Sequence, residues 1–482
     1  MQEKSKKFKY VDIFEKGYLI FEPSKSFLIY FKGVIRNIMN TFNQYNNANV
    51  VINNEFIFDP WLYGSLYNNS WYPYGKKTLK ENKLKKIKYC FISHLHQDHW
   101  DLDTIKYLPK KTLFIIPKFK VNKIIENTLK KYNFKNILYA PIKKFINIDN
   151  KYYISVVRPL NNEGLETKSL IYKNDDKEID AGCIVRIKKD MSNHLLLSDN
   201  TPYNVKGFLN DYKKIEFNTV WSPFNGYASD YPFCYDNFSI EQKKKISKKH
   251  DKKKQKLLFR FFKKIKPNLI IPYSSQFTLK NKNEKIFNKI VDRNFLSQKK
   301  YCDFFVKKFK TKNITYLKPN QTLHVKKNQY IIKTDNSKNI RNLKINILKS
   351  NFPQLNSNYN VDNFVSDLNA TVNSTKVRIK KYKLNVEKIN QTAFFILINN
   401  INKIYRIDFK KSTFYEYKNQ KNMIKKEFKK SLVLKVDLKI ISNILNRKLH
   451  INNCQIGLQL NWERYPNHYN QELYDALNFF HK

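Results

Sequence analysis

The stretch Ser93-His94-Leu95-His96-Gln97-Asp98-His99 decides how this chain of 482 residues is interpreted. It holds three imidazoles and one carboxylate, and the apolar segment Tyr89-Cys90-Phe91-Ile92 directly precedes it. Alternation at a strand end places the first two imidazoles on one face, and the following turn brings Asp98 and His99 toward the same point. Imidazole and carboxylate together suit zinc, iron or manganese. The motif predicts a metal site, and two metals about 3.5–4 Å apart would use all four groups.

A surface loop that is rich in histidine by chance is the competing interpretation. The whole chain has nine histidines, and three of them lie in this motif. His194 stands at the start of a predicted strand and is interpreted as a surface or structural residue, and the other five have no partners at suggestive spacing: His250, His324, His450, His468 and His481. Because short motifs with the correct flanking context seldom mislead, the metal site is the better interpretation.

The length and the spacing of the cysteines indicate a protein of several domains that is not stabilised by disulfide bonds. At about 150 residues per domain, the chain corresponds to two or three domains. Its five cysteines lie far apart and none forms a CxxC pair, so neither a disulfide framework nor a structural zinc knuckle is expected. No uninterrupted apolar stretch is long enough for a signal sequence or a membrane span. We expect a soluble, cytoplasmic protein that does not contact membranes.

The formal net charge of +51 raises the question of a nucleic-acid partner. Only ten of the 91 basic residues are arginine, and the lysines are spread along the whole chain beside Asn, Ile, Tyr and Phe. This profile is typical of an AT-rich genome, whereas nucleic-acid surfaces more often concentrate arginine. The charge therefore disfavours nucleic acid and favours an anionic small-molecule substrate.

Strand and helix patterns alternate outward from the motif, which predicts an α/β layered fold. A β-hairpin over residues 49–58 ends at Asp59, and a second hairpin-like pair over 183–198 lies between Asp180 and Asp199. Further strands are expected at 112–117 and 267–272, a β pattern at 314–332, and helices at 104–108, 124–132 and 239–264.

The same patterns divide the chain into three parts. Residues 1–44 are interpreted as an N-terminal extension, residues 45–340 as the metal domain, and residues 341–482 as a small α+β domain. Residues 350–358 are interpreted as a linker. In the last part we expect strands at 376–382, 393–398, 403–409 and 432–436, and helices at 438–445 and 471–480.

Asp59-Pro60-Trp61, the histidine motif and Asp199 together resemble the metallo-β-lactamase superfamily. The resemblance spans about residues 45–335 and implies an αββα sandwich with metals at strand ends between two sheets. A narrower likeness is to the catalytic part of CMP-N-acetylneuraminate and UDP-N-acetylmuramic acid hydroxylases. It lies in residues 58–64, 92–99, 180–183, 199–204 and 221–232, and residues 457–470 are similar to the end of those proteins.

The resemblance implies two metal positions. Two imidazoles and one carboxylate would hold the first metal, an aspartate and a histidine the second, and a further aspartate would bridge them. In that order the ligands are His94, His96 and Asp180, then Asp98 and His99, then Asp199. Asp98, which can accept a proton, is also the candidate catalytic residue.

Other residues of the resembling segments receive supporting roles. Asp59 would orient a ligand or a loop from behind the metal ligands, and a simple turn cap before Pro60 is the alternative. Tyr227, Ser229 and Tyr231 are candidates for lining the substrate pocket, although aromatic residues are abundant in this chain and packing in the core is the commoner role for tyrosine.

Two departures from the resembling families bear on the cofactor and the partners. Asp180 and Tyr273-Ser274-Ser275 stand where the superfamily's hydrolases carry histidines, and this harder ligand set favours iron, with manganese and zinc left open. The hydroxylases also carry a Rieske domain with paired Cys and His motifs, which this chain lacks. An oxygenase would then need electrons from a separate Rieske or ferredoxin protein.

Three functions follow as expectations. The first is a monooxygenase that hydroxylates a nucleotide-linked amino sugar. The alternative is a metallo-hydrolase that uses a metal-bridging water on a phosphoester, lactone or amide. The third is a sugar-binding or assembly protein with a structural metal.

Overall fold

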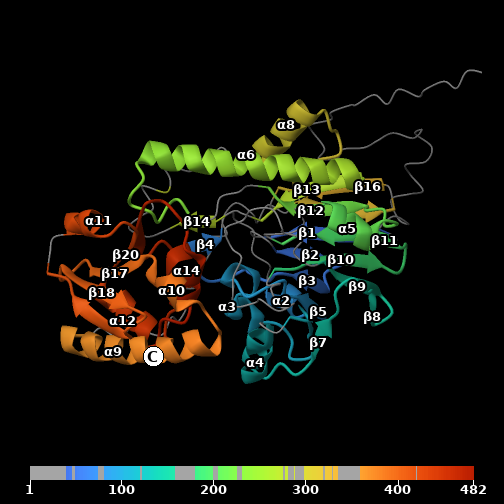
Figure 1. Ribbon diagram of the computed structural model, residues 1–482. Coiled ribbons are helices and arrows are strands. Elements are labelled where there is room, and N and C mark those ends of the chain that lie inside the picture. The colour runs from blue at the N-terminus through green and yellow to red at the C-terminus, as the bar shows by residue number, and fades with distance from the viewer. Residues whose placement is uncertain are drawn as a thin grey trace, which may run out of the picture.

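The computed structural model shows two stacked sheets with helices outside them, and a separate C-terminal sheet with its own helices (Figure 1). The structure describes residues 39–45, 49–73, 81–119, 122–157, 180–198, 205–224, 231–274, 277–279, 287, 298–318, 321–327, 329–334, 359–418 and 421–482.

The first sheet has eight strands and carries the histidine motif at one edge. Its strands β3, β5, β6 and β7 run parallel, with β7 at the edge of the sheet, and Phe58 pairs with Phe91 across β3 and β5. In spatial order the strands are β16 (Gln329–Thr334), β15 (Gln321–Lys326), β1 (Asn40–Gln44), β2 (Val50–Ile52), β3 (Phe56–Phe58), β5 (Tyr89–Phe91), β6 (Leu113–Pro117) and β7 (Ile137–Ala140).

The second sheet has six strands and carries Asp180 at one edge. Cys183 pairs with Leu196, so the start of β10 lies beside the end of β11. In spatial order the strands are β13 (Leu269–Tyr273), β12 (Thr219–Pro223), β11 (Ser192–Leu196), β10 (Gly182–Ile187), β9 (Tyr152–Val157) and β8 (Ile146–Ile148). A small pair, β4 (Trp71–Pro73) and β14 (Phe277–Leu279), lies outside both sheets.

The alternation of side chains along each strand explains the layers. Val50 and Ile52 pack into the core between the two sheets, whereas Val51 packs into the core on the outer face of the first sheet. Since both faces are buried, strands such as Phe56–Phe58 are continuously apolar.

Helices cover both outer faces of the paired sheets. α3 (Leu102–Ile105) and α4 (Lys123–Lys131) pack on the first sheet. α5 (Val205–Tyr212), α6 (Ile240–Ile265) and α8 (Gln298–Phe309) pack on the second. The predicted αββα sandwich with a small C-terminal α+β domain is therefore confirmed.

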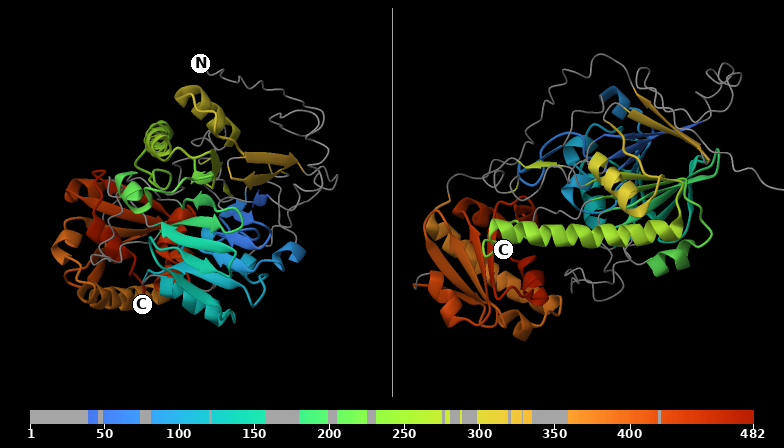
Figure 2. Two further views of the ribbon diagram at one scale, coloured as in Figure 1. Left: turned by 90° about the vertical axis from the view of Figure 1, so that its right-hand side faces the viewer. Right: turned by 90° about the horizontal axis from the view of Figure 1, so that it is seen from above.

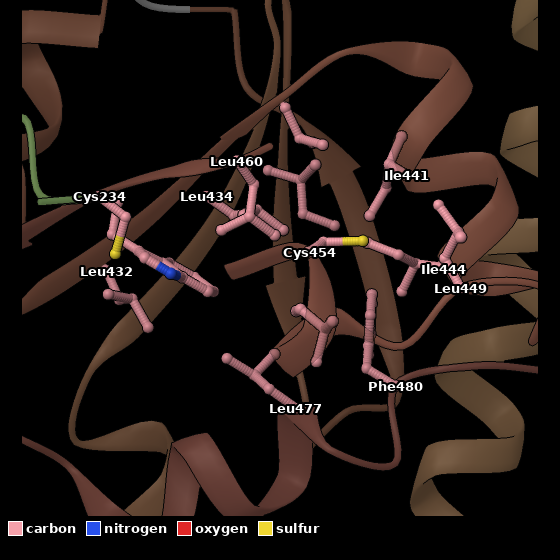
Figure 3. Packing of buried hydrophobic residues seen from close by; sticks show 14 of the residues in the cluster. Cys234, Leu432, Leu434, Ile441, Ile444, Leu449, Cys454, Leu460, Leu477 and Phe480 are labelled. Carbon is pink, nitrogen blue, oxygen red and sulfur yellow. The ribbon is translucent and has the colours of Figure 1, made fainter. Parts of the chain in front are cut away.

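The C-terminal domain consists of a five-stranded sheet and the helices around it. Its strands, in spatial order, are β19 (Thr413–Glu416), β18 (Lys403–Asp408), β17 (Ala393–Ile398), β20 (Ser431–Val436) and β21 (Asn461–Tyr465). Its main helices are α9 (Val361–Lys381), α10 (Val386–Asn390), α12 (Leu438–Leu445), α13 (Ile451–Ile456) and α14 (Gln471–Leu477). Figure 3 shows Cys454 of α13 lying in the core among leucine and isoleucine side chains.

Two features join the C-terminal domain to the sandwich. One hydrophobic cluster contains Trp61, Tyr67 and Trp71 together with the C-terminal core. The 26-residue helix α6 is about 39 Å long at ~1.5 Å per residue, and it runs along both bodies (Figure 2). Ser239 and Gln242 form a capping box at its start.

The structure corrects one boundary and one element. The strand β1 already begins at Asn40, inside the predicted extension, so the predicted domain start at residue 45 falls after this strand. The predicted strand at 376–382 is the end of helix α9. The predicted linker, and the domain boundary near residue 340, lie outside the described residues.

Two further findings concern the chain as a whole. All five cysteines lie in the described residues, where they are buried and form no disulfide bond. In the part of the chain that the structure describes, no helix is both long enough and apolar enough to cross a membrane.

Candidate metal centre

The candidate site lies where strand ends of the two sheets meet. Asp59 follows β3 and His94 follows β5, and these parallel neighbours end at the same edge, where Asp59 N donates to Phe91 O at 2.9 Å. Asp180 directly precedes β10 of the other sheet. His94 Nε2 lies 3.4 Å from Asp180 Oδ1, so side chains of the two sheets contact each other at this point.

The first group of side chains consists of His94, His96 and Asp180. Each offers one ligand atom, and these atoms lie within 4.8 Å of one another. His94 Nε2 is 2.8 Å from His96 Nδ1. His94 and Asp180 are each 1% exposed, whereas His96 is half-buried. The structure therefore brings together the three residues that the resemblance assigned to the first metal ion.

The donor chemistry of this first group fits a metal ion. Ligand atoms around a tetrahedral metal with ~2.1 Å bonds lie ~3.4 Å apart. The 3.4 Å between His94 Nε2 and Asp180 Oδ1 is of this size, whereas the 2.8 Å between His94 Nε2 and His96 Nδ1 is shorter and is a hydrogen-bonding distance. Burying a carboxylate costs several kcal/mol unless a cation or hydrogen bonds compensate, and a metal would supply such a cation at Asp180. The described residues thus contain a possible His/Asp metal site.

The second group consists of Asp98 and His99, with Asp59 behind the histidine. His99 Nε2 is 3.4 Å from Asp98 Oδ2, and the rings of His94 and His99 lie 4.1 Å apart. His99 Nδ1 is 2.6 Å from Asp59 Oδ2. A carboxylate on one ring nitrogen fixes the tautomer and directs the other nitrogen toward a metal. Asp59 therefore lies where it can orient His99.

The position of Asp59 is itself tightly held. Its carboxylate accepts from the backbone N of Ser93 at 2.8 Å and from Ser93 Oγ at 2.7 Å. Its backbone has φ of +46°, a left-handed conformation that is uncommon outside glycine. Complete burial raises the pKa of the Asp59 carboxyl, and the charge of His99 acts in the opposite direction.

Sequence reasoning missed Tyr67, which contacts a predicted ligand directly. The Tyr67 hydroxyl donates to Asp98 Oδ1 at 2.7 Å, and the side chain is 1% exposed. One of 32 tyrosines carries little signal by itself. The pair Asn68-Asn69, which favours left-handed backbone, could have marked the loop as a constrained one.

The two cysteines nearest this edge in sequence are poor ligand candidates. Burial raises the pKa of both Cys90 and Cys183 thiols well above the ordinary value, and the charge of Asp59 adds to the effect. Because the thiolate is the form that binds metal, these neutral thiols serve as packing groups instead.

The other predicted site residues are placed as follows. Asp199, Tyr227 and Ser229 lie outside the described residues, so their roles stay predictions. Tyr231 is half-buried and packs against Tyr235, with ring centroids 5.1 Å apart, and against Arg464 of the C-terminal domain. Its predicted contact with substrate likewise stays a prediction.

By the resemblance, the segment Tyr273-Ser274-Ser275 stands where the superfamily's hydrolases carry a histidine. The Tyr273 hydroxyl donates to the backbone O of Leu197, directly after β11, and the side chain is fully buried. In this chain the position therefore braces the strand that leads toward Asp199.

No family model matches the chain. A stretch of 78 residues is 32% identical to a Mycobacterium tuberculosis protein provisionally named a Rieske 2Fe-2S iron-sulfur protein, covering 16% of this chain and 15% of that protein. A similarly named protein of Mycolicibacterium smegmatis is 31% identical over 80 residues. The match thus spans 15% of the length of these relatives.

Several solved structures are distantly similar. A possible metal-dependent hydrolase from Veillonella parvula has a TM-score of 0.39 and 16% identity, and the match covers 59% of this chain and 98% of that one. Isothiocyanate hydrolase from Delia radicum gut bacteria has a TM-score of 0.38 and 15% identity, with 58% and 98% covered. For CmlA, a diiron beta-hydroxylase from Streptomyces venezuelae, the values are 0.37 and 12%, with 60% and 54% covered.

Proposed function

We propose that this chain is a metal-dependent oxygenase in which His94, His96 and Asp180 hold an iron ion. The observation that carries the proposal is the buried convergence of two imidazoles and one carboxylate, with ligand atoms within 4.8 Å. Two histidines and one carboxylate that leave coordination positions open are typical of non-haem iron oxygenases. Bound iron would supply the activation of dioxygen.

The remaining side chains of the site hold and shield this centre. Asp59 fixes the orientation of His99, and Asp98 can accept a proton beside it. Both carboxylates are buried, at 0% and 6% exposure, so bulk water is largely kept from them. Such shielding limits side reactions of the activated cofactor.

For the substrate we propose a nucleotide-linked amino sugar. The support is the likeness of residues 58–64, 92–99 and 221–232 to sugar-nucleotide hydroxylases, together with the net charge of +51, which favours anionic substrates. Electrons would come from a separate Rieske or ferredoxin protein.

A second candidate function is hydrolysis of a phosphoester, lactone or amide. The observation that favours it is the second group, because Asp98 and His99 lie within 3.4 Å of one another beside the first group. Two adjacent metal positions are an arrangement that many hydrolases use.

Metal content and product mass separate the two functions. We expect anaerobically reconstituted protein to retain iron and, with a reductant and a CMP-linked amino sugar, to give a product heavier by one oxygen. His96→Ala should neither retain iron nor form the heavier product, whereas the control His468→Ala, at an exposed position, should do both. Turnover with zinc and no reductant would establish the hydrolase instead. Protein that binds no metal at all would contradict both functions.

A further inference from the structure

The loop of residues 64–71, here called the Tyr67 loop, contacts the metal centre on one side. The Tyr67 hydroxyl donates to Asp98 Oδ1 at 2.7 Å, and Tyr67 N donates to Gln97 Oε1 at 2.7 Å. Asp98 Oδ2 is then the oxygen that lies 3.4 Å from His99 Nε2. The hydrogen bond from Tyr67 to Oδ1 thus leaves Oδ2 of Asp98 facing His99, where the second metal position is expected.

The C-terminal domain contacts the same loop from the other side. Asn68 and Gln459 exchange two hydrogen bonds: Asn68 Nδ2 donates to Gln459 Oε1 at 2.5 Å, and Gln459 Nε2 donates to Asn68 O at 3.0 Å. Trp71 Nε1 donates to the backbone O of Ile456 at 3.2 Å. Asn68 Nδ2 also lies 3.4 Å from Cys454 Sγ, so four hydrogen bonds tie the loop to α13 and to the turn that follows it.

Gly457 allows this turn to approach the loop closely. A Cβ at this position would lie 2.9 Å from the backbone O of Tyr67 and 3.1 Å from Tyr67 Cβ. Backbone atoms cannot swing aside as a flexible side chain can, so any larger residue would displace the loop. The turn is itself fixed, because Cys454 of α13 is buried in the C-terminal core (Figure 3).

The backbone of the Tyr67 loop needs such support. Tyr67, Asn68 and Asn69 have φ of +49°, +57° and +62°. Consecutive left-handed residues other than glycine are unfavourable and persist only where the surroundings hold them. The described surroundings that hold them include Gln97 of the sandwich and the α13 turn.

We propose that the C-terminal domain positions the metal-binding carboxylate of Asp98 through the Tyr67 loop, and so sets the affinity of the second metal position. Tyr67, Gly457 and Gln459 are positioning residues in this account, because they act through Asp98. The inference rests on the proposed function, since it presupposes metal at the site, and on the second metal position that the resemblance implies at Asp98 and His99. It assigns to the C-terminal domain a role in assembling the centre.

The test is anaerobic titration of the full-length chain with Co(II), which reports each bound equivalent by its visible spectrum and its affinity. We expect two equivalents in the wild type. In Tyr67→Phe the first should bind unchanged and the second about 10- to 100-fold more weakly, as for other residues that orient ligands. The matched control is Tyr405→Phe, a buried tyrosine of β18 in the C-terminal core, which should bind as the wild type does.

The C-terminal side of the account is tested with Gln459→Ala. We expect a smaller loss in the same direction at the second equivalent, whereas the exposed control Gln391→Ala should have no effect. If Tyr67→Phe does not fold, the affinity of the second equivalent in Gln459→Ala tests the inference by itself. Unchanged affinity in either variant, or a single equivalent in the wild type, would overturn the inference while leaving the metal enzyme intact. A wild type that binds no Co(II) or Fe(II) contradicts the proposed function itself.

Discussion

Two buried histidines in the same sandwich have opposite surroundings. His194 of β11 is 0% exposed, and its two ring nitrogens lie 2.9 Å from the hydroxyl oxygens of Thr219 and Ser192. His94 is 1% exposed, and its Nε2 lies 2.8 Å from another imidazole and 3.4 Å from a buried carboxylate. Hydroxyls satisfy a neutral imidazole, whereas imidazoles and carboxylates in one place call for a cation.

The comparison teaches that burial of a histidine is no mark of a metal site by itself. What distinguishes His94 is the convergence of Asp180 from the other sheet on the same nitrogen. We therefore predict that substitutions around His94 change metal affinity strongly. At His194 we predict only a change in how stability depends on pH.

The largest effect is expected from Asp180→Ala. Removing one of three converging ligands should weaken the first metal equivalent by more than about 100-fold, beyond the usual effect of residues that only orient ligands. Co(II) titration measures the change. The control is Asp251→Ala, which removes a carboxylate on α6 that is also buried, at 2% exposure. Equal affinities in both variants would show that Asp180 is no ligand.

A smaller effect is expected from Asp59→Asn. The amide weakens the bond that now fixes His99 Nδ1, so the second equivalent should bind about 10- to 100-fold more weakly while the first is kept. Asp190→Asn is a close control, because Asp190 likewise accepts from a serine backbone N and hydroxyl, those of Ser192. If Co(II) titration gives the same affinity for the second equivalent in Asp59→Asn and in Asp190→Asn, Asp59 is only a turn cap.

The first group could be predicted from sequence because most of it is local. His94 and His96 are two residues apart behind a strand, and the resemblance to the superfamily supplied Asp180. Tyr67 could not be predicted, because its bond to Asp98 spans 31 positions and depends on a loop that the distant Gln459 holds. Contacts made by tertiary packing leave no periodic trace in the sequence.

The layers of the sandwich were predictable for a similar reason, and the error at 376–382 shows the limit. Val377 and Ile379 alternate with basic residues, which resembles a strand. In the structure these residues end helix α9, where Ile379 continues a buried face with Phe364 and Leu368, and Val377 is 66% exposed. Over seven residues a helix end and a strand share one pattern, and the packing surface decides between them.

The smallest effect is expected at His194, on stability. Burial lowers the pKa of His194 to about 3, from 6.5 in the ordinary state. The unfolded chain therefore binds a proton more readily than the folded one between these values, so stability falls as the pH falls below 6.5. Between pH 7.5 and pH 5.5 this group should cost about 1.4 kcal/mol of unfolding free energy.

Urea unfolding of the metal-free protein at the two pH values measures this cost, and the reference variant is His194→Gln. The variant should lose less stability on acidification than the wild type does, because glutamine does not titrate. Identical losses would mean that His194 is not a buried neutral histidine.

The most direct test of the central claim is anomalous diffraction from crystals grown with Fe(II) under anaerobic conditions. We predict an iron peak at bonding distance, about 2.0–2.2 Å, from the imidazoles of His94 and His96 and from the carboxylate of Asp180. Iron bound elsewhere, or an iron-free site between these three side chains in crystals that contain the metal, would contradict the account.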